Sequence, residues 1–504
     1  MTHRSIRLAC AAGLAAIAML PGAAGAAPRA ATANEDRPER LREVGHSPLM
    51  DRGMNAAIAI HGDYAYIGSR TDGSHVGQPQ GGIMVVDISR PRRPELLTET
   101  PIDPRPGESS RELRVWRSQD ILIVLNTNCG AGPTLHHCST TVEESRNFRF
   151  YDISGRNAER PRLITQMEEH THEFFLWEDP NNPRRALMFG GNAGSQCGEH
   201  PTPSCPFAVW DISPVLEGER PETLFSGPHG YTRIPPDPAL PVQKSAGGLH
   251  SLSVTNDGST AYYALLTGGF AVVDVSDFAA DRPSPQPRPI TFNVSRPTWR
   301  GPGAHSAVKL WGRDWAWVSD EVYGTATGPA HGCPWGWARM VDITDPTRPS
   351  VEAAYRIDEN DPDTCDEFNP PRTSYSAHNP TLTPNIAFST WHSGGLQAVS
   401  IEKPWRPFQL AEYFPRPLRE VMLEDPRLSS DPDTGRNEKV VMWSYPIVND
   451  GLIYVVDLRN GLYVLEYTGP FRREVGRIGF LEGNSNQGDA LCFEPVGEAP
   501  ADCD

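Results

Sequence analysis

Residues 82–89 read Gly-Ile-Met-Val-Val-Asp-Ile-Ser, a small residue and an apolar run that ends in Asp before Ile and Ser. The same signature returns six more times along the chain, with Ser and Glu in place of Asp in the last two copies. The anchor positions are Asp87, Asp152, Asp211, Asp274, Asp342, Ser400 and Glu466. Because successive anchors lie 58 to 68 residues apart, seven similar units cover most of the chain.

Each unit carries a regular set of short apolar runs. In the first unit, residues 56–61 and 64–69 precede the signature, and a run introduced by Pro94 follows it. Runs of β-branched and aromatic residues bounded by Gly, Asp and Pro are typical of strands. Four antiparallel strands in each of seven units predict an all-β fold, a seven-bladed β-propeller of four-stranded blades. We also expect the signature aspartates to cap the tight turn after each strand.

The N-terminus has the pattern of a secretory signal peptide. Arg4 and Arg7 precede an apolar run over residues 8–20, and Ala24-Gly25-Ala26 fits a cleavage site. We therefore expect a secreted, extracytoplasmic protein. Its predicted organisation is a signal peptide over residues 1–26, an N-terminal segment over 27–50, the propeller over 51–470 and a C-terminal tail with a disulfide over 471–504. Residues 41–46 and 474–480 are rival candidates for the strand that closes the ring.

Charge and hydropathy limit the partners that we expect. The formal net charge of −17 argues against nucleic acid and anionic lipid. No segment after the signal peptide approaches the roughly 18 apolar residues of a membrane span. The predicted ligand is thus a small molecule or a macromolecule bound at a propeller face, and the predicted state is a monomer.

The cysteines fit an oxidising compartment. Eight remain after the signal peptide, and their order gives four local candidate pairs: Cys129–Cys138, Cys197–Cys205, Cys333–Cys365 and Cys492–Cys503. Thiolate ligands for a metal are the alternative, although the chain has no C-x-x-C motif.

Histidines recur in register with the repeats. His172, His250, His305 and His378 each stand at the start of the innermost predicted strand of a unit, in four consecutive units. Innermost strands line the channel of a propeller, and the turn between the second and third strands lies at the same face. That turn adds further candidate ligands, which are His392 in the sixth unit and Asp320 with its neighbour Glu321 in the fifth.

Imidazole groups with an added carboxylate are a ligand set for Fe, Zn or Cu. The sequence therefore predicts a transition-metal site at the channel mouth. Its candidate ligands are His172, His250, His305, His378, His392 and Asp320. The alternative is that each histidine is solvated or satisfied in the core. His170 and Glu173 flank His172, and they either orient it or lie on the surface.

Arginines occupy the corresponding positions on the opposite arc. Arg111 starts an inner strand, and Arg70 and Arg459 lie in second-to-third-strand turns. A guanidinium group binds carboxylate or phosphate through two parallel hydrogen bonds. These residues are therefore candidates for binding an anionic substrate, with ordinary surface arginines as the alternative.

Two functions remain open from the residues alone. The first is a metal-dependent oxidoreductase or hydrolase, and the second is a non-catalytic propeller that recognises protein or glycan. A tryptophan cluster in the fifth unit fits either packing between blades or a carbohydrate surface. Its members are Trp311, Trp315, Trp317, Trp335 and Trp337.

The signature resembles the LVIVD repeat family, whose units carry an apolar run ending in Asp followed by Ile-Ser and a Pro-rich turn. The resemblance covers about residues 50–470 and implies a propeller of exported or surface proteins. The histidine-rich channel mouth is similar in architecture to the selenium-binding protein and methanethiol oxidase family, seven-bladed propellers with a histidine-bound copper site. That likeness adds a copper oxidase as a hypothesis and assigns no residue roles.

Overall fold

The computed structural model describes residues 39–70, 81–97, 101–105, 108–127, 129–130, 137–138, 147–169, 171–191, 206–231, 246–266, 268–292, 303–321, 335–361, 363–365, 374–424 and 439–483. The chain divides into two compact units, Met1–Pro38 and Glu39–Asp504. All described residues lie in the second unit, so the predicted signal peptide lies outside them.

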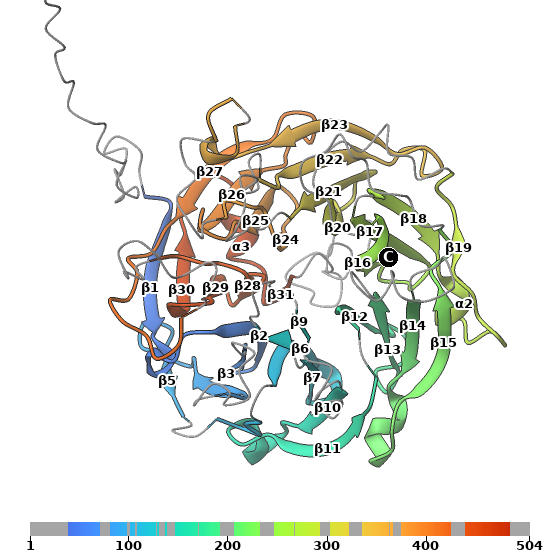
Figure 1. The fold of residues 1–504 in the computed structure, drawn as a ribbon, viewed down its shortest axis with the longest axis horizontal. Coiled ribbons are helices and arrows are strands. Elements are labelled where there is room, and N and C mark those ends of the chain that lie inside the picture. The colour runs from blue at the N-terminus through green and yellow to red at the C-terminus, as the bar shows by residue number, and fades with distance from the viewer. Residues whose placement is uncertain are drawn as a thin grey trace, which may run out of the picture. The chain divides into compact units, whose positions relative to one another are not determined.

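Seven antiparallel blades with four strands each make up the unit Glu39–Asp504, and they follow one another around a centre (Figure 1). A pairing of Leu266 with Ala304 joins blades four and five into one sheet, and blade seven carries a fifth short strand. The strands, from the inner to the outer edge of each blade, are β2 (Asn55–His61), β3 (Tyr64–Ser69), β4 (Met84–Asp87) and β5 (Glu95–Leu96) in blade one; β6 (Ser109–Trp116), β7 (Ile121–Thr127), β10 (Asn147–Asp152) and β11 (Arg162–Met167) in blade two; β12 (Glu173–Glu178), β13 (Ala186–Gly191), β14 (Pro206–Asp211) and β15 (Glu222–Pro228) in blade three; β16 (Ala246–Val254), β17 (Thr260–Leu266), β18 (Phe270–Asp274) and β19 (Arg288–Pro289) in blade four; β20 (Ala304–Lys309), β21 (Trp315–Asp320), β22 (Ala338–Asp342) and β23 (Ser350–Tyr355) in blade five; β24 (Pro380–Leu382), β25 (Ile386–Thr390), β26 (Leu396–Ser400) and β27 (Phe408–Tyr413) in blade six; and β28 (Ile447–Asn449), β29 (Leu452–Asp457), β30 (Gly461–Tyr467) and β1 (Leu41–Ser47) in blade seven. The predicted seven-bladed propeller is confirmed.

The ring closes through its first strand. β1 pairs antiparallel with β30 and so forms the outer edge of blade seven. The rival segment 474–480 instead contributes the end of helix α3 (Arg472–Val475) and the start of β31 (Phe480–Glu482). β31 pairs with β28, so this short strand extends blade seven on its inner edge, toward the channel.

The signature aspartates cap turns, as the sequence predicts. In each copy that carries Asp, one carboxylate oxygen accepts a hydrogen bond from the backbone N–H two residues later. The five bonds are Ser89 to Asp87 at 2.8 Å, Ser154 to Asp152 at 2.9 Å, Ser213 to Asp211 at 2.8 Å, Ser276 to Asp274 at 2.9 Å and Thr344 to Asp342 at 2.8 Å. This local role explains why the repeat keeps Asp at the end of its third strand.

Apolar side chains of neighbouring blades pack against each other between the sheets. In blade five, Trp317 and Trp337 belong to one buried cluster with residues of blade six, and Trp335 is fully buried. Packing between blades is therefore the role that the structure gives to Trp317 and Trp337. Burial of an indole of this size contributes about 3–5 kcal/mol to stability.

Short elements lie in the connections between strands. They are η1 (Leu49–Asp51), η2 (Arg117–Gln119), η4 (Gly155–Ala158), η5 (Ser213–Glu217), η7 (Asp358–Asn360), α2 (Ser276–Ala279) and the hairpin of β8 (Cys129–Gly130) and β9 (His137–Cys138). In the described part of the chain, no helix has the length and apolar character needed to cross a membrane.

Two of the predicted cysteine pairs involve described residues. Cys129 and Cys138 are directly opposite each other in the hairpin β8–β9. Cys365 is buried and disulfide-bonded. The remaining predicted partners lie outside the described residues; they are Cys197, Cys205, Cys333, Cys492 and Cys503.

Candidate metal centre

Four of the predicted histidines meet where inner strands begin. His172 directly precedes β12, His250 lies in β16, His305 is the second residue of β20, and His378 comes two residues before β24. The ring centroids of successive histidines in this order are 4.4, 3.8 and 4.2 Å apart. The ring of blades thus brings imidazoles from four consecutive blades into one row, which we call the histidine row.

Irregular strand pairing sets the direction of several side chains at the centre. The register of β20 shifts around His305, which becomes an extra residue, and the register of β6 shifts in the same way around Arg111. The irregularity of β16 spans His250. A bulge bends the strand and redirects the side chain of the extra residue. Bulges therefore turn side chains of three inner strands toward the centre.

His392 extends the histidine row from the turn between β25 and β26. Its ring centroid lies 4.9 Å from that of His378. Its φ of 37° is in the left-handed region that residues other than glycine rarely adopt. Such a conformation persists where surrounding contacts hold it, which is typical of functional sites.

Three imidazoles of the row are anchored through Nδ1. The contacts are His305 Nδ1 to Ser306 Oγ at 2.6 Å, His378 Nδ1 to the Trp443 carbonyl oxygen at 2.6 Å, and His392 Nδ1 to Ser374 Oγ at 3.1 Å. Because a carbonyl oxygen only accepts, Nδ1 of His378 carries the hydrogen and its Nε2 presents a lone pair in the neutral ring. A ring held through one nitrogen while the other faces a common point is the usual arrangement of metal-binding histidines.

Glu321 is the carboxylate that these three imidazoles share. Its Oε1 lies 3.0 Å from His378 Nε2 and 3.5 Å from His392 Nε2, and its Oε2 lies 3.5 Å from His305 Nε2. Asp320, the carboxylate that the sequence analysis favours, instead accepts hydrogen bonds at Oδ2 from Arg339 Nε and Nη2 at 2.9 and 2.7 Å. Asp320 is thus paired with Arg339, and Glu321 is the carboxylate that lies among the histidines.

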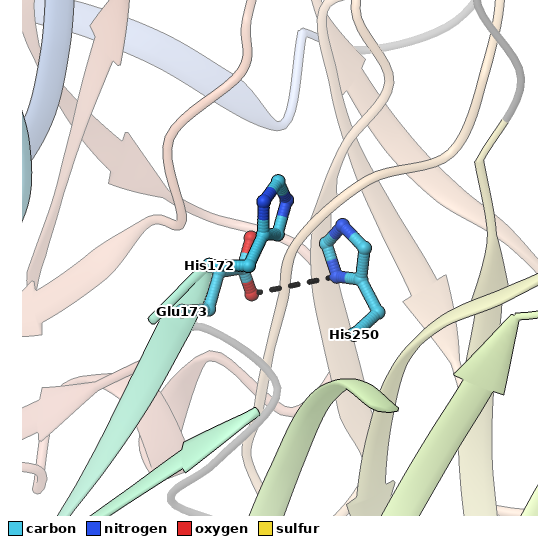
Figure 2. Close-up of side chains that lie close together, drawn as sticks. All are labelled: His172, Glu173 and His250. Atoms are coloured by element: carbon cyan, nitrogen blue, oxygen red, sulfur yellow. Dashed lines mark ion pairs between the residues drawn. The ribbon is translucent and has the colours of Figure 1, made fainter. Parts of the chain in front are cut away.

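Glu173 is a second buried carboxylate, at the other end of the histidine row. It is the first residue of β12, and its carboxylate lies beside His250 and below the ring of His172 in Figure 2. Glu173 Oε2 is 3.8 Å from His250 Nδ1, and Oε1 is 3.6 Å from His305 Nε2. Among the described residues, neither oxygen accepts a hydrogen bond, although the side chain is only 1% exposed.

The described residues contain three groups that could hold a metal ion, and each consists of two histidines and one glutamate. The groups are His172, Glu173 and His250; His250, His305 and Glu321; and Glu321, His378 and His392. Within each group the donor atoms all lie within 4.8 Å of one another. Two imidazoles and a carboxylate form the protein ligands of several catalytic zinc sites and of non-haem Fe(II) sites.

Burial makes this end of the channel unfavourable for negative charge. It raises the pKa of Glu173 well above the usual range, and the charge of Glu112 adds to this rise, whereas Arg111 opposes it. Arg114 is fully buried nearby, with Nη2 3.8 Å from Glu112 and Nη1 3.4 Å from Glu482 of β31. A bound cation beside Glu173 would offset the free-energy cost of its buried charge.

Two of the three predicted arginines border the histidine row. Arg111 Nη1 and Nη2 lie 3.0 and 2.9 Å from the two ring nitrogens of His172, and Nη2 lies 3.9 Å from Glu173 Oε1. The guanidinium groups of Arg111 and Arg70 lie 5.6 and 5.5 Å from the centre of the Trp443 ring. The Trp443 ring in turn lies 5.1 Å from that of His378. Trp443 therefore links the two arginines to the far end of the row.

Arg459 has a different environment. Its guanidinium pairs with Glu424, with Nε 2.9 Å from Oε2, and donates a hydrogen bond to Asn460 Oδ1 at 3.0 Å. These contacts fasten the segment around Glu424 to blade seven. They give Arg459 a structural role, which removes it from our candidates for substrate binding.

Two side chains of the site, Glu173 and Trp443, are not among the ligands and binding residues that the sequence predicts. For Glu173 the sequence predicts an orienting role or a place on the surface, and for Trp443 it makes no prediction. A signal for Glu173 was its place next to His172 at the start of an inner strand. Trp443 lies four residues before β28, whereas His378 lies two residues before β24, so repeat register did not point to Trp443.

The LVIVD repeat family matches residues 52–99, which comprise blade one, so the chain contains an LVIVD repeat. No curated protein matches the chain at a significant level.

Solved propeller structures resemble the chain at low sequence identity. Sqt1 of Chaetomium thermophilum, bound to the N-terminus of ribosomal protein L10, is 14% identical over 84% of this chain and 90% of its own, with a TM-score of 0.43. The C-terminal WD40 domain of Sif2 is 8% identical over 86% and 99%, with a TM-score of 0.46. A hypothetical selenium-binding protein of Sulfolobus tokodaii is 13% identical over 60% and 66%, with a TM-score of 0.41.

Proposed function

We propose that this chain is an exported metalloprotein whose histidine row binds a divalent transition-metal ion and acts on an anionic small molecule. The observation that carries the proposal is the environment of Glu173. Its carboxylate is buried, accepts no hydrogen bond from a described residue, and lies 3.6 Å from a ring nitrogen of His305 and 3.8 Å from one of His250. Ligand atoms of one tetrahedral zinc ion, each about 2.0–2.2 Å from it, are separated by roughly 3.3–3.6 Å.

The donor set favours some ions over others. Imidazole suits Zn, Cu, Fe and Ni, whereas carboxylate oxygen disfavours Cu(I). We therefore expect Zn(II) or Fe(II) first, with Cu(II) as the third candidate. A bound ion of this kind would supply Lewis acidity toward a carbonyl or phosphoryl oxygen of a substrate, or redox capacity in the case of Fe or Cu.

The surrounding residues support binding of an anion. Arg111 lies against His172 and packs on Trp443, so it can form paired hydrogen bonds to a carboxylate or phosphate next to a metal-bound group. Arg70 packs on Trp443, which is buried, and the pair shields one side of the site from water. Anchoring of Nδ1 in three histidines fixes the direction of their Nε2 atoms before any ligand binds.

Export rests on separate features. The N-terminal pattern of Arg4, Arg7 and an apolar run is that of a secretory signal peptide. The disulfide at Cys365 fits an oxidising compartment. Fractionation of the producing cells tests this part of the proposal, and retention of the uncleaved chain in the cytoplasm would contradict it.

Metal analysis tests the central part. The protein is purified without a histidine tag, stripped with a chelator, loaded separately with Zn(II), Fe(II) or Cu(II), and dialysed before elemental analysis. We expect at least one ion per chain for one of these metals and a clear loss in a variant that carries both Glu173→Gln and Glu321→Gln. Glu178→Gln, at the other end of β12, is the matched control and should bind as the wild type does. A wild-type protein that retains none of the three metals would contradict the proposal and favour a recognition propeller.

A further inference from the structure

The histidine row offers more ligands than one ion can use. Its five imidazoles and two carboxylates provide seven donor side chains, whereas a structural or catalytic zinc ion takes three or four from the protein. The first group of His172, Glu173 and His250 shares no residue with the third group of Glu321, His378 and His392. Two complete sets of two histidines and one carboxylate are thus present side by side.

We propose that the histidine row is a two-metal centre, with one ion at each end and His305 between them. This inference rests on the proposed function and adds the number and placement of the ions. His305 Nε2 lies 3.6 Å from Glu173 and 3.5 Å from Glu321, so the facing oxygens of the two carboxylates are within about 7 Å of each other. Ligands from both ends therefore converge on one imidazole.

The two ends differ in how well their ligands are held. At the third group, Nδ1 of both His378 and His392 is anchored, and their Nε2 atoms face Glu321. At the first group, both ring nitrogens of His172 are in contact with the Arg111 guanidinium. An ion at His172 must displace this contact, so the third group binds its ion more tightly than the first.

Charge balance predicts the class of ligand. Two divalent ions carry four positive charges, and the two carboxylates offset only half of these. The adjacent Arg111 adds one more positive charge at the first group. The loaded centre is therefore cationic, and it takes an anion with at least two oxygen atoms, such as a carboxylate or a phosphate ester, that pairs with Arg111 beside the first group.

Calorimetric titration of the metal-free protein with Zn(II) tests the stoichiometry. The wild type should bind two ions, with dissociation constants that differ by at least 10-fold. His172→Ala should abolish the weaker binding event and keep the tighter one, whereas His392→Ala should weaken the tighter event by at least 100-fold. His61→Ala, which lies outside the row and pairs with Asp120, serves as the control with both events intact.

Substitution with Co(II) gives a second readout that does not depend on activity. Two ions in adjacent groups should give an optical or paramagnetic signal that changes between the first and second equivalents. Circular dichroism of each variant checks that the propeller is folded. If an alanine variant does not fold, Glu173→Gln or Glu321→Gln is used in its place. Saturation of the wild type at one ion would overturn the two-metal proposal while leaving the proposed function intact. Absence of any bound ion would refute both.

Discussion

Glu482 allows a quantitative test of how β31 sits in the channel. Its side chain is fully buried and lies 3.4 Å from Arg114 Nη1. Burial raises the pKa of Glu482 from 4.5 to about 7, because the loss of hydration outweighs the attraction of Arg114 and Arg117; Glu112 and Glu178 add to the rise. A carboxyl group in water on the unfolded chain would keep its ordinary pKa.

The sign of the effect on stability follows from this difference. Between pH 4.5 and about 7 the folded protein holds the proton on Glu482 while the unfolded chain has released it. The contribution of Glu482 to stability is therefore fully present below pH 4.5 and is lost as the pH rises to about 7. At about 1.4 kcal/mol for each pKa unit, the loss amounts to roughly 3 kcal/mol.

The perturbation is Glu482→Gln, which keeps the shape of the side chain and removes its titration. Unfolding by urea, followed by tryptophan fluorescence with a chelator present, gives the free energy of unfolding at several values from pH 5 to pH 8. As the pH rises over this range, we expect the free energy of unfolding of the variant to increase by about 3 kcal/mol relative to that of the wild type. Glu466→Gln, which removes an exposed ion pair with Arg42, is the control. Its free energy of unfolding should change with pH as that of the wild type does. If the free energy of unfolding depends on pH in the same way for Glu482→Gln and the wild type, Glu482 is not buried. Such a result would also refute the position of β31 beside β28.

Three further predictions test the core, the repeat and the metal ligands. Trp317→Ala should lower the free energy of unfolding by about 3–5 kcal/mol, whereas Trp405→Ala, at a side chain that is 61% exposed, should change it by less than about 1 kcal/mol; urea unfolding measures both. Asp152→Ala removes the turn cap at Ser154 and should cost about 1–2 kcal/mol in the same assay, with an unchanged value speaking against the capping role. Ser374→Ala removes the anchor of His392 Nδ1 and should weaken the tighter Zn(II) binding event by about 10-fold in calorimetry; equal affinity would show that this hydrogen bond does not orient the ligand.

The repeat signature carried most of the information about the fold. The apolar run that ends in Asp marks the third strand of a blade, and the spacing of its copies predicted seven blades, which the sheets bear out. The role of Asp87 and its equivalents was also predictable, because an Asx cap involves only residues close in sequence. The choice of the strand that closes the ring was not predictable, because β1 and β30 meet through a contact between the two ends of the chain.

The site was predictable to the level of repeat register but not to the level of individual side chains. Register alone placed His172, His250, His305 and His378 at equivalent points of successive blades. The choice between Asp320 and Glu321 depends on the ion pair of Asp320 with Arg339 of the neighbouring strand, which no local pattern reveals. Arg459 shares its register with Arg70, yet the ion pair with Glu424 gives it a structural contact. Such contacts between distant segments decide which side chains reach the centre.

The most direct test of the account is an anomalous diffraction map at the zinc edge from crystals of the Zn(II)-loaded protein. We expect anomalous peaks in the channel, each about 2.0–2.2 Å from histidine nitrogens and a glutamate oxygen of the row. The tighter site should lie at Glu321, His378 and His392, and the weaker one at His172, Glu173 and His250. A channel without any peak, in crystals that were grown with saturating Zn(II), would contradict the assignment of these residues as a metal centre.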